Sequence, residues 1–399
     1  MYVAPNGNVF NAGPNTDTGY LSTAGTGSWS ATPNLLRTAA GDERGAGTSV
    51  MYAPGKIMNI GGGLGGGITN TTELLDINGS APTFVAGLPM ALPRMHVNST
   101  MLPDGSVLVT GGTTKPSVDD QDATLFPELW QPGNKLSPKG TWTVMAPMHE
   151  PRLYHSTALL LPDATVLSTG GGQGGQYADH PTYEIFTPPY LCRGLTRPVL
   201  SSAPEAVAYQ QPFTVTSPQA GTIARATLVR LSSVTHSFNM NQRFLELPVA
   251  VVNGSELRLT APANANTCPP GHYLLFLLDA NGTPSIAKII SVNSSACASL
   301  LTLAETSVSR TSACELLATY STGGQNLAAG YRWFIDGEYK PQFDNQSSIS
   351  YPFEVRTARA TIRVEVPPAC GGNILLSAAL DVRQFFPQCA VQVERPALR

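Results

Sequence analysis

A short motif recurs four times in the first half of the chain. It consists of a turn, a short apolar strand and glycine. The matching strand residues are Val9, Ile57, Val107 and Val166, so the copies are 48, 50 and 59 residues apart. Three copies also have an upstream strand, in the segments TSVMYA, HVNSTML and YHSTALLL. Because the order of features repeats along with the spacing, the sequence predicts four successive small antiparallel sheets.

An aromatic residue ends each stretch between copies, at Trp29, Phe84 and Trp142. A period near 50 residues, a Gly-Gly strand end and a trailing aromatic are typical of kelch-type β-propeller blades. Four unrelated hairpins are the alternative, since Gly-Gly is common in β proteins. Four blades are at the lower limit for a closed propeller. We therefore expect residues 1–192 to be about four blades from the C-terminal part of a propeller, with further blades upstream.

The composition favours strands and excludes some classes of partner. Charged residues make up 13% of the 399 and the formal net charge is −3, so neither nucleic acid nor an anionic membrane is indicated. The 38 glycines and 33 prolines suit short strands joined by turns. The longest apolar runs, such as residues 273–278, are far too short to span a bilayer. We expect an all-β chain with no membrane span.

The pattern changes beyond the repeats. Short alternating strands follow in QPFTVTS, RATLVRL, FLELPVAVV, ELRLTAP and HYLLFLLDANGTPSIAKIISV, which is typical of an immunoglobulin-like β-sandwich. This predicts a second domain at residues 197–292. After the linker NSSACAS, Trp333 lies between two cysteines, which favours a second small, disulfide-linked β-sandwich at residues 297–399. No catalytic constellation is visible there, and we interpret it as a binding or spacer module.

The six cysteines are an even number, and we expect all of them to form disulfides. The last four allow three connectivities, of which nested pairing is our choice. The expected pairs are Cys192–Cys268, Cys297–Cys389 and Cys314–Cys370.

Asn-X-Ser/Thr sequons, together with the cysteines, favour a secreted glycoprotein. The seven sequons begin at Asn70, Asn78, Asn98, Asn253, Asn281, Asn293 and Asn345. The chain opens with MYVAPNGNVF, which lacks the basic and apolar segments of a signal peptide. This opening reads as the middle of a strand–turn–strand pattern, so we expect a natural N-terminal part to precede it.

Tyr154 and His155 place a phenol and an imidazole side by side at the start of the segment YHSTALLL. Neighbours on a regular strand point to opposite faces, so both can reach one point only from a loop or an irregular strand start. Pro151 favours such an entry. A further histidine, His236, lies in the strand–loop–strand segment THSFNMNQR of the first sandwich.

Four segments resemble, in order, the copper radical oxidases, the galactose oxidase and glyoxal oxidase family. They are RLYHSTALLLPD, YEIFTPPYL, THSFNMNQR and PPGHYLLFLLDANGTPSIA. The resemblance covers roughly residues 2–292. It implies a kelch propeller with copper on its axis, and an early-set β-sandwich whose loop delivers one histidine. By that resemblance Tyr154 is the axial ligand and the catalytic side chain, His155 is an equatorial ligand and His236 is the delivered ligand. Phenolate and imidazole also suit Cu(II) on chemical grounds.

The family's chemistry is oxidation of a primary alcohol or aldehyde with reduction of O2 to H2O2. One oxidising equivalent comes from copper and the other from a tyrosine cross-linked to a cysteine. No cysteine precedes Cys192 in this sequence, so we expect that the Tyr–Cys radical cofactor is not encoded in this chain. The chain alone is then expected to be inactive.

Two functional hypotheses remain open. The first is a secreted copper radical oxidase-like protein acting on a small-molecule alcohol, aldehyde or carbohydrate. The alternative is a non-catalytic extracellular or cell-wall glycoprotein, for which a matrix polysaccharide is a candidate partner. Of the other histidines, His96, His149 and His272 are expected to be surface or structural residues, and His180 to order a turn.

Overall fold

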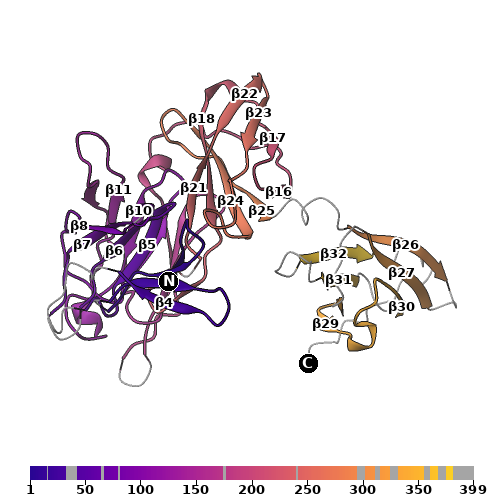
Figure 1. The fold of residues 1–399 in the computed structure, drawn as a ribbon, viewed down its shortest axis with the longest axis horizontal. Coiled ribbons are helices and arrows are strands. Elements are labelled where there is room, and N and C mark those ends of the chain that lie inside the picture. Colours follow the sequence, from indigo (N-terminus) through magenta and orange to yellow (C-terminus); the bar gives the residue numbers. More distant parts are fainter. Residues whose placement is uncertain are drawn as a thin grey trace, which may run out of the picture. The chain divides into compact units, whose positions relative to one another are not determined.

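The structure is a computed structural model of the 399-residue chain. It describes residues 1–15, 17–32, 43–63, 67–79, 81–173, 177–239, 241–293, 302–310, 315–323, 331–354, 360–366 and 374–380. These residues form β-strands and four short 3-10 turns but no α-helix, which confirms the all-β class. They divide into two compact units, residues 1–293 and residues 294–399 (Figure 1).

Four antiparallel sheets follow one another in the first half of unit 1, and we number them blades 1 to 4 (Figure 1). In each, consecutive strands pair in chain order. The strands of blade 1 are β1 (Tyr2–Val3), β2 (Val9–Asn11), β3 (Gly19–Ser22) and β4 (Ser28–Ala31). Those of blade 2 are β5 (Thr48–Ala53), β6 (Lys56–Ile60), β7 (Thr72–Asp76) and β8 (Thr83–Ala86). Those of blade 3 are β9 (Asn98–Met101), β10 (Val107–Thr110), β11 (Glu128–Gln131) and β12 (Thr141–Val144). The described strands of blade 4 are β13 (Ser156–Leu160), β14 (Val166–Gly170) and β15 (Tyr183–Phe186).

The repeated motif marks the same strand in every blade. Val9, Ile57, Val107 and Val166 all lie on the second strand, where three of the four are fully buried. The trailing aromatics Trp29, Phe84 and Trp142 lie on the fourth strands β4, β8 and β12. The second-strand residues are more buried than the trailing aromatics. Apolar β-branched side chains of the second strands fill the space between sheets, whereas the fourth strands are mostly exposed.

An arginine at the entry to each of blades 2, 3 and 4 connects the blades. The guanidinium groups of Arg44, Arg94 and Arg152 donate to the glycine carbonyl at the end of their own blade's second strand, at 2.9, 3.2 and 2.9 Å. The carbonyl of Arg94 accepts from the N–H of Gly62, and that of Arg152 from Gly112, both at 2.8 Å. The pairs Gly61–Gly62 and Gly111–Gly112 are therefore bonded both to their own blade and to the next one.

The rest of unit 1 is a two-sheet sandwich (Figure 1). Its larger sheet has the order β16 (Ala206–Ala208), β25 (Lys288–Asn293), β24 (Gly271–Asp279), β18 (Ile223–Arg230) and β21 (Phe244–Leu247). Its smaller sheet has the order β17 (Pro212–Thr216), β23 (Glu256–Thr260) and β22 (Val249–Asn253). Alternate residues of β24 face two different cores. Leu275 and Leu277 pack inside the sandwich, and Leu274 and Phe276 pack against the blades. This shared strand holds the sandwich onto the propeller.

Unit 2 also consists of two sheets. They are β26 (Thr302–Arg310), β27 (Glu315–Gly323) and β30 (Ser348–Glu354), and β29 (Glu338–Tyr339), β28 (Arg332–Ile335), β31 (Ala360–Val366) and β32 (Ile374–Leu380). Trp333 is fully buried in the core of this unit. The cysteines of the two expected nested pairs lie outside the described residues, and those pairs stay predictions.

The expected Cys192–Cys268 disulfide is wrong for this structure, in which both are free thiols. Cys192 is exposed at the end of the turn η2 (Pro189–Leu191), with its Sγ 3.7 Å from the Thr187 carbonyl oxygen. Cys268 is instead fully buried in the sandwich core, where burial raises the pKa of its thiol to about 11. An even number of cysteines does not indicate whether Cys192 and Cys268 are close enough to form a disulfide.

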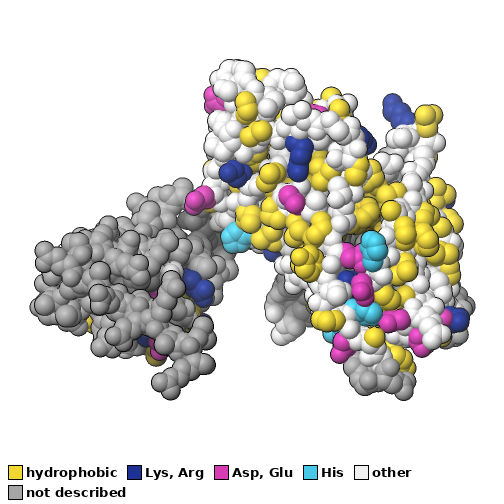
Figure 2. All heavy atoms as spheres, turned by 180° about the vertical axis from the view of Figure 1, so that it is seen from behind, with side chains coloured by type: hydrophobic (Ala, Val, Ile, Leu, Met, Phe, Trp, Pro, Cys, Tyr) yellow, Lys and Arg dark blue, Asp and Glu magenta, His cyan; other side chains and the backbone are white. Residues whose placement is uncertain are grey.

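Among the described residues, no helix is long and apolar enough to cross a membrane. Charged side chains are sparse on the face shown in Figure 2, in keeping with the 13% charged composition. Acidic and histidine side chains gather at one place on that face (Figure 2).

Candidate metal centre

Tyr154 and His155 lie in a turn that ends where β13 begins, closed by the Ser156 N–H donating to the Leu153 carbonyl at 3.0 Å. His155 has φ +63°, a left-handed conformation that non-glycine residues rarely adopt. The irregular strand start that the sequence predicted is therefore present. It breaks the alternation of a strand and lets both rings face the same side, with 3.9 Å between their centroids.

His236 occupies the turn of a short hairpin, β19 (Val234–Thr235) and β20 (Phe238–Asn239), that projects from the sandwich. The hairpin contacts the first strands β5, β9 and β13 of blades 2, 3 and 4. Thr48 Oγ1 donates to the Ser237 carbonyl at 2.6 Å. His236 and Ser237 have φ +49° and +71°, so the turn is tight. These contacts fix the position of the His236 side chain among the blade entries.

The three expected ligand residues lie close together, although His155 and His236 are 81 positions apart in the sequence. The Tyr154 ring centroid is 5.5 Å from that of His236, and the two imidazole centroids are 4.9 Å apart. The two imidazole planes are nearly perpendicular, at 85°. His155 and His236 are exposed and Tyr154 is half-buried in the described structure. The cluster is thus open to solvent and small molecules.

The hydrogen bonds around the two imidazoles leave one nitrogen of each ring available. Nδ1 of His155 lies 3.2 Å from the Gly172 carbonyl oxygen. A carbonyl only accepts, so this nitrogen carries a proton, and in the neutral ring Nε2 then has the lone pair. Nδ1 of His236 lies 2.6 Å from Thr235 Oγ1, which again leaves Nε2 without a protein partner at that distance.

This donor set fits Cu(II). Two imidazole nitrogens and a phenol oxygen are the ligand types that Cu(II) prefers, and an outer carbonyl holding Nδ1–H is a usual support for a ligating histidine. In the described part of the chain, no group of three or more His, Cys, Asp or Glu side chains is arranged so that it could hold a metal ion. The Tyr154 phenol is consequently essential to any three-donor site here.

His96 also belongs to this cluster, which the sequence reasoning did not expect. Its ring packs edge-on against Tyr154, with 5.2 Å between centroids. Burial, together with the nearby His155, lowers the pKa of His96 below its ordinary value. The signal that could have found it is local. His96 follows Arg94 shortly before the first strand of blade 3, as His155 follows Arg152 before that of blade 4.

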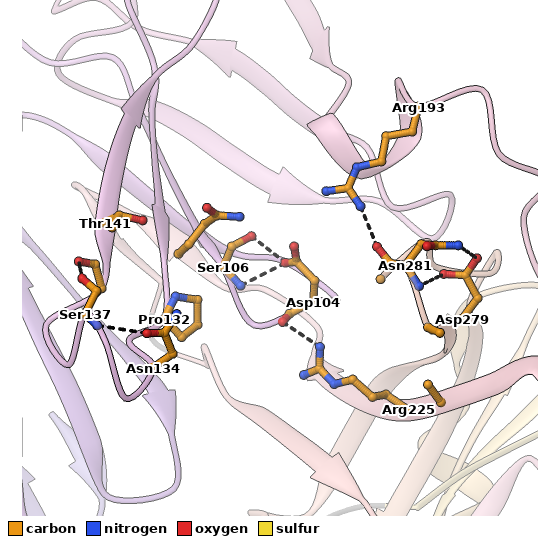
Figure 3. Close-up of a pocket in the computed structure, with 15 residues that line it drawn as sticks. Asp104, Ser106, Pro132, Asn134, Ser137, Thr141, Arg193, Arg225, Asp279 and Asn281 are labelled. Carbon is orange, nitrogen blue, oxygen red and sulfur yellow. Dashed lines mark hydrogen bonds between the residues drawn. The ribbon is translucent and has the colours of Figure 1, made fainter.

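A cleft of about 550 Å³ in unit 1 is a different place (Figure 3). It lies between the turns of blade 3 and the loop that follows β24, and none of the cluster residues lines it. Its polar groups bond mainly to one another. Arg193 donates to the Asn281 carbonyl, and Arg225 to the Asp104 carbonyl at 3.1 Å (Figure 3). We place the chemistry at the aromatic cluster because two imidazoles and a phenol converge there.

Two family models match the chain. Residues 69–190 match the model described as glyoxal oxidase N-terminus. Residues 197–292 match the model described as galactose oxidase-like, early set domain. Tyr154 and His155 fall within the first match and His236 within the second.

Individual proteins of known activity are also similar to this chain. A galactose oxidase from Gibberella zeae is 30% identical over 302 residues, which is 72% of this chain and 43% of the relative. The aldehyde oxidase GLOX of Vitis pseudoreticulata is 32% identical over 276 residues, 61% of this chain and 52% of the relative. A fungal alcohol oxidase of the AA5 family, solved in complex with copper, is 31% identical with a TM-score of 0.66. That match covers 72% of this chain and 62% of the solved one. The chain thus spans about half the length of the curated relatives it matches.

Proposed function

Because the chain belongs to the galactose oxidase and glyoxal oxidase family, we propose that unit 1 provides the copper-binding part of an oxidase. Its substrate would be a small-molecule primary alcohol or aldehyde, or a carbohydrate that carries such a group. The overall reaction would convert an alcohol and O2 into an aldehyde and H2O2. The observation that carries this proposal is the convergence of Tyr154, His155 and His236 at the blade entries.

Each side chain has a distinct part in the proposed site. Nε2 of His155 and Nε2 of His236 would hold copper from two elements, one of the propeller and one of the sandwich. The Tyr154 phenol would be the third donor and, as the strongest base of the three when ionised, would accept the hydroxyl proton of the substrate. When bound, copper would supply one oxidising equivalent. The two-electron oxidation therefore needs a second oxidising group.

We propose that the second oxidising group is not encoded in this sequence. No cysteine precedes Cys192 in the sequence, and Cys192 lies at the end of turn η2 with its Sγ near the Thr187 carbonyl. We propose that the polypeptide as printed binds copper but lacks the Tyr–Cys radical pair.

Copper loading followed by a peroxide assay tests the proposal. The protein should bind one equivalent of Cu(II), and Tyr154→Phe should weaken binding, whereas Tyr183→Phe, whose side chain is 70% exposed on β15, should not. Steady H2O2 production from alcohols or aldehydes should be absent. Strong turnover would show that the radical group has been misplaced. A protein that binds no copper, or binds it equally well without Tyr154, would instead favour the non-catalytic extracellular protein.

We also propose that the protein is a secreted glycoprotein, and the structure separates its sequons by accessibility. Asn98 is 3% exposed on β9, and its amide donates to Ser156 Oγ at 2.9 Å. Asn253 is exposed at the end of β22, and Asn281 is exposed in a turn. Glycopeptide mass spectrometry of protein from a secreting host should find glycan at the exposed sites and none at Asn98.

A further inference from the structure

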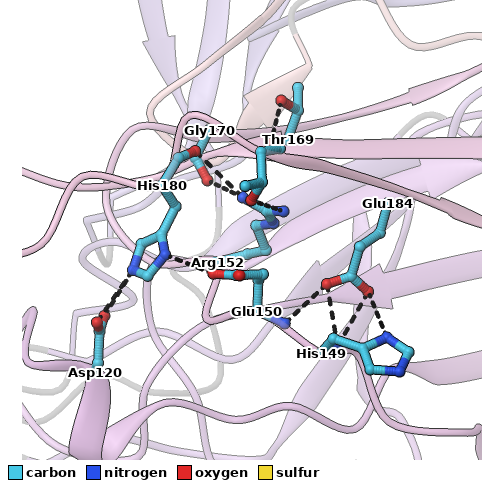
Figure 4. Close-up of polar contacts among 9 residues, drawn as sticks. Asp120, His149, Glu150, Arg152, Thr169, Gly170, His180 and Glu184 are labelled. Atoms are coloured by element: carbon cyan, nitrogen blue, oxygen red, sulfur yellow. Dashed lines mark hydrogen bonds and ion pairs between the residues drawn. The ribbon is translucent and has the colours of Figure 1, made fainter.

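His180 lies between two carboxylates that come from different parts of the propeller (Figure 4). Its Nε2 is 3.0 Å from Asp120 Oδ1, in the turn η1 (Asp120–Asp122) between blade 3's second and third strands. Its Nδ1 is 2.9 Å from Glu150 Oε2, just before blade 4. A carboxylate only accepts hydrogen bonds, so both ring nitrogens must donate, and the ring is an imidazolium. The side chain is 10% exposed.

The backbone around His180 leads to the candidate metal centre. Arg152 Nη1 donates to the Gly170 carbonyl at 2.9 Å (Figure 4). The His180 N–H donates to the Gly171 carbonyl at 2.8 Å. The next residue, Gly172, donates its N–H to the Tyr154 carbonyl at 2.9 Å. Its own carbonyl accepts from Nδ1 of His155. From either carboxylate, three successive hydrogen bonds and the Gly171–Gly172 peptide bond therefore lead to the His155 ring.

Gly172 has no spare room in this arrangement. It has φ +125°, and a Cβ built on it would collide with the Asp179 side chain and the Ala178 carbonyl. The segment that ends at His180 is therefore packed directly on the residue that bonds His155. A shift of this segment would move the Gly172 carbonyl.

We propose that His180 is a positioning residue: its bridge between Asp120 and Glu150 holds the segment 178–180 against Gly172, and thereby keeps His155 in the tautomer with its proton on Nδ1. The predicted tautomer of His155 is a property of the metal-free protein. Only its effect on copper binding rests on the proposed copper site. A histidine fixed in this tautomer offers Nε2 to a metal, whereas the other tautomer would not.

The bridge should respond to pH. Burial disfavours the charged ring, but the hydrogen bonds from Asp120 and Glu150 and their charges raise the pKa of His180 above its ordinary value of 6.5. Arg152 donates to the His180 carbonyl, and Asp179 precedes His180 in the chain. The ion pair of Lys115 with Asp122, the last residue of η1, is a further neighbouring charge. The contribution of the charged His180 ring to the folding free energy is fully present below about pH 6.5. It is lost as the pH rises through the raised pKa, because one carboxylate then loses its donor.

Histidine-selective ¹⁵N NMR of the copper-free protein tests the proposal, since the chain has only six histidines. In the wild type, His155 should show the Nδ1–H tautomer. His180→Gln, which can donate to only one carboxylate, should give a mixture of tautomers at His155. The matched control is His149→Gln, because the His149 side chain is 94% exposed beside Glu184 (Figure 4) and should change nothing.

One further readout needs only the wild type and keeps the test decisive if His180→Gln folds poorly. In the wild type alone, the His155 tautomer should change between pH 6 and pH 9 together with loss of the His180 proton. The melting temperature difference between wild type and His180→Gln should be largest at pH 6 and shrink toward pH 9. His180→Gln should also lower Cu(II) affinity by about 10- to 100-fold.

An unchanged His155 tautomer in His180→Gln, or a neutral His180 ring at pH 6, would overturn the positioning role. A wild type that binds no copper while its His155 tautomer still follows His180 would refute the proposed copper site and leave this inference standing.

Discussion

At the scale of single residues, the centre depends on backbone conformations that side chains rarely tolerate. His155, His236 and His96 all have positive φ, between +49° and +63°. Strained residues of this kind persist only where the surrounding structure holds them, and they concentrate at functional sites. Here the hydrogen bonds of the Gly172 carbonyl and of Thr48 provide that support.

His236→Ala should lower Cu(II) affinity by more than about 100-fold, because losing a ligand should cost more than losing an outer partner. His272→Ala is the matched control, since His272 is exposed on β24 and outside the cluster. Isothermal titration calorimetry measures both. Equal affinity of the two variants would mean that the resemblance to the family is architectural only. His96→Ala is unsuitable as a neutral control because its ring contacts Tyr154.

At the scale of structural elements, the blades are held in register by buried arginines. Nη2 of Arg94 is 2.6 Å from Glu128 Oε1, and both side chains are at most 1% exposed. Glu128 Oε2 also accepts from the Ala91 N–H at 2.7 Å. The pair therefore connects the entry of blade 3 to its third strand.

Arg94→Met should reduce the free energy of unfolding by about 3–5 kcal/mol, since it leaves the Glu128 carboxylate buried and unpaired. Lys56→Met breaks an exposed pair with Asp76, in which the side chains are 46% and 40% exposed, and should cost only about 0–1 kcal/mol. Chemical denaturation of both variants gives the comparison. A loss below about 1 kcal/mol for Arg94→Met would show that the blades do not depend on this contact.

The sequence predicted the blades well because buried second strands and glycine ends recur with a fixed spacing. The resemblance to the family predicted that Tyr154, His155 and His236 lie together, whereas Pro151 indicated only the irregular strand start. The sequence did not place His96 in the cluster, because an isolated histidine has no distinguishing pattern. Only the comparison of Arg94 and His96 with Arg152 and His155 indicates its position. The Cys192–Cys268 pair was wrong because cysteine counts contain no distances.

At the scale of the whole molecule, all members of the centre belong to unit 1. Core residues Leu274 and Phe276 of β24 join sandwich and blades, so the hairpin that carries His236 is attached to the propeller through a shared core. Unit 2 has a separate core around Trp333.

Removing residues 294–399 should therefore leave Cu(II) affinity within about twofold of the full chain, because no donor is lost. Calorimetric titration of the shortened and full proteins under one set of conditions measures this. A large loss of affinity, with the circular dichroism of unit 1 preserved, would show that unit 2 contributes to the centre.

Electron paramagnetic resonance of the Cu(II)-loaded protein, with ¹⁵N-labelled histidine, tests the copper site most directly. Two imidazole nitrogens should couple to one tetragonal Cu(II), and the spectrum of His236→Ala should show a single coupled nitrogen. A spectrum without histidine couplings, or one that His236→Ala leaves unchanged, would contradict the assignment of this cluster as a copper centre.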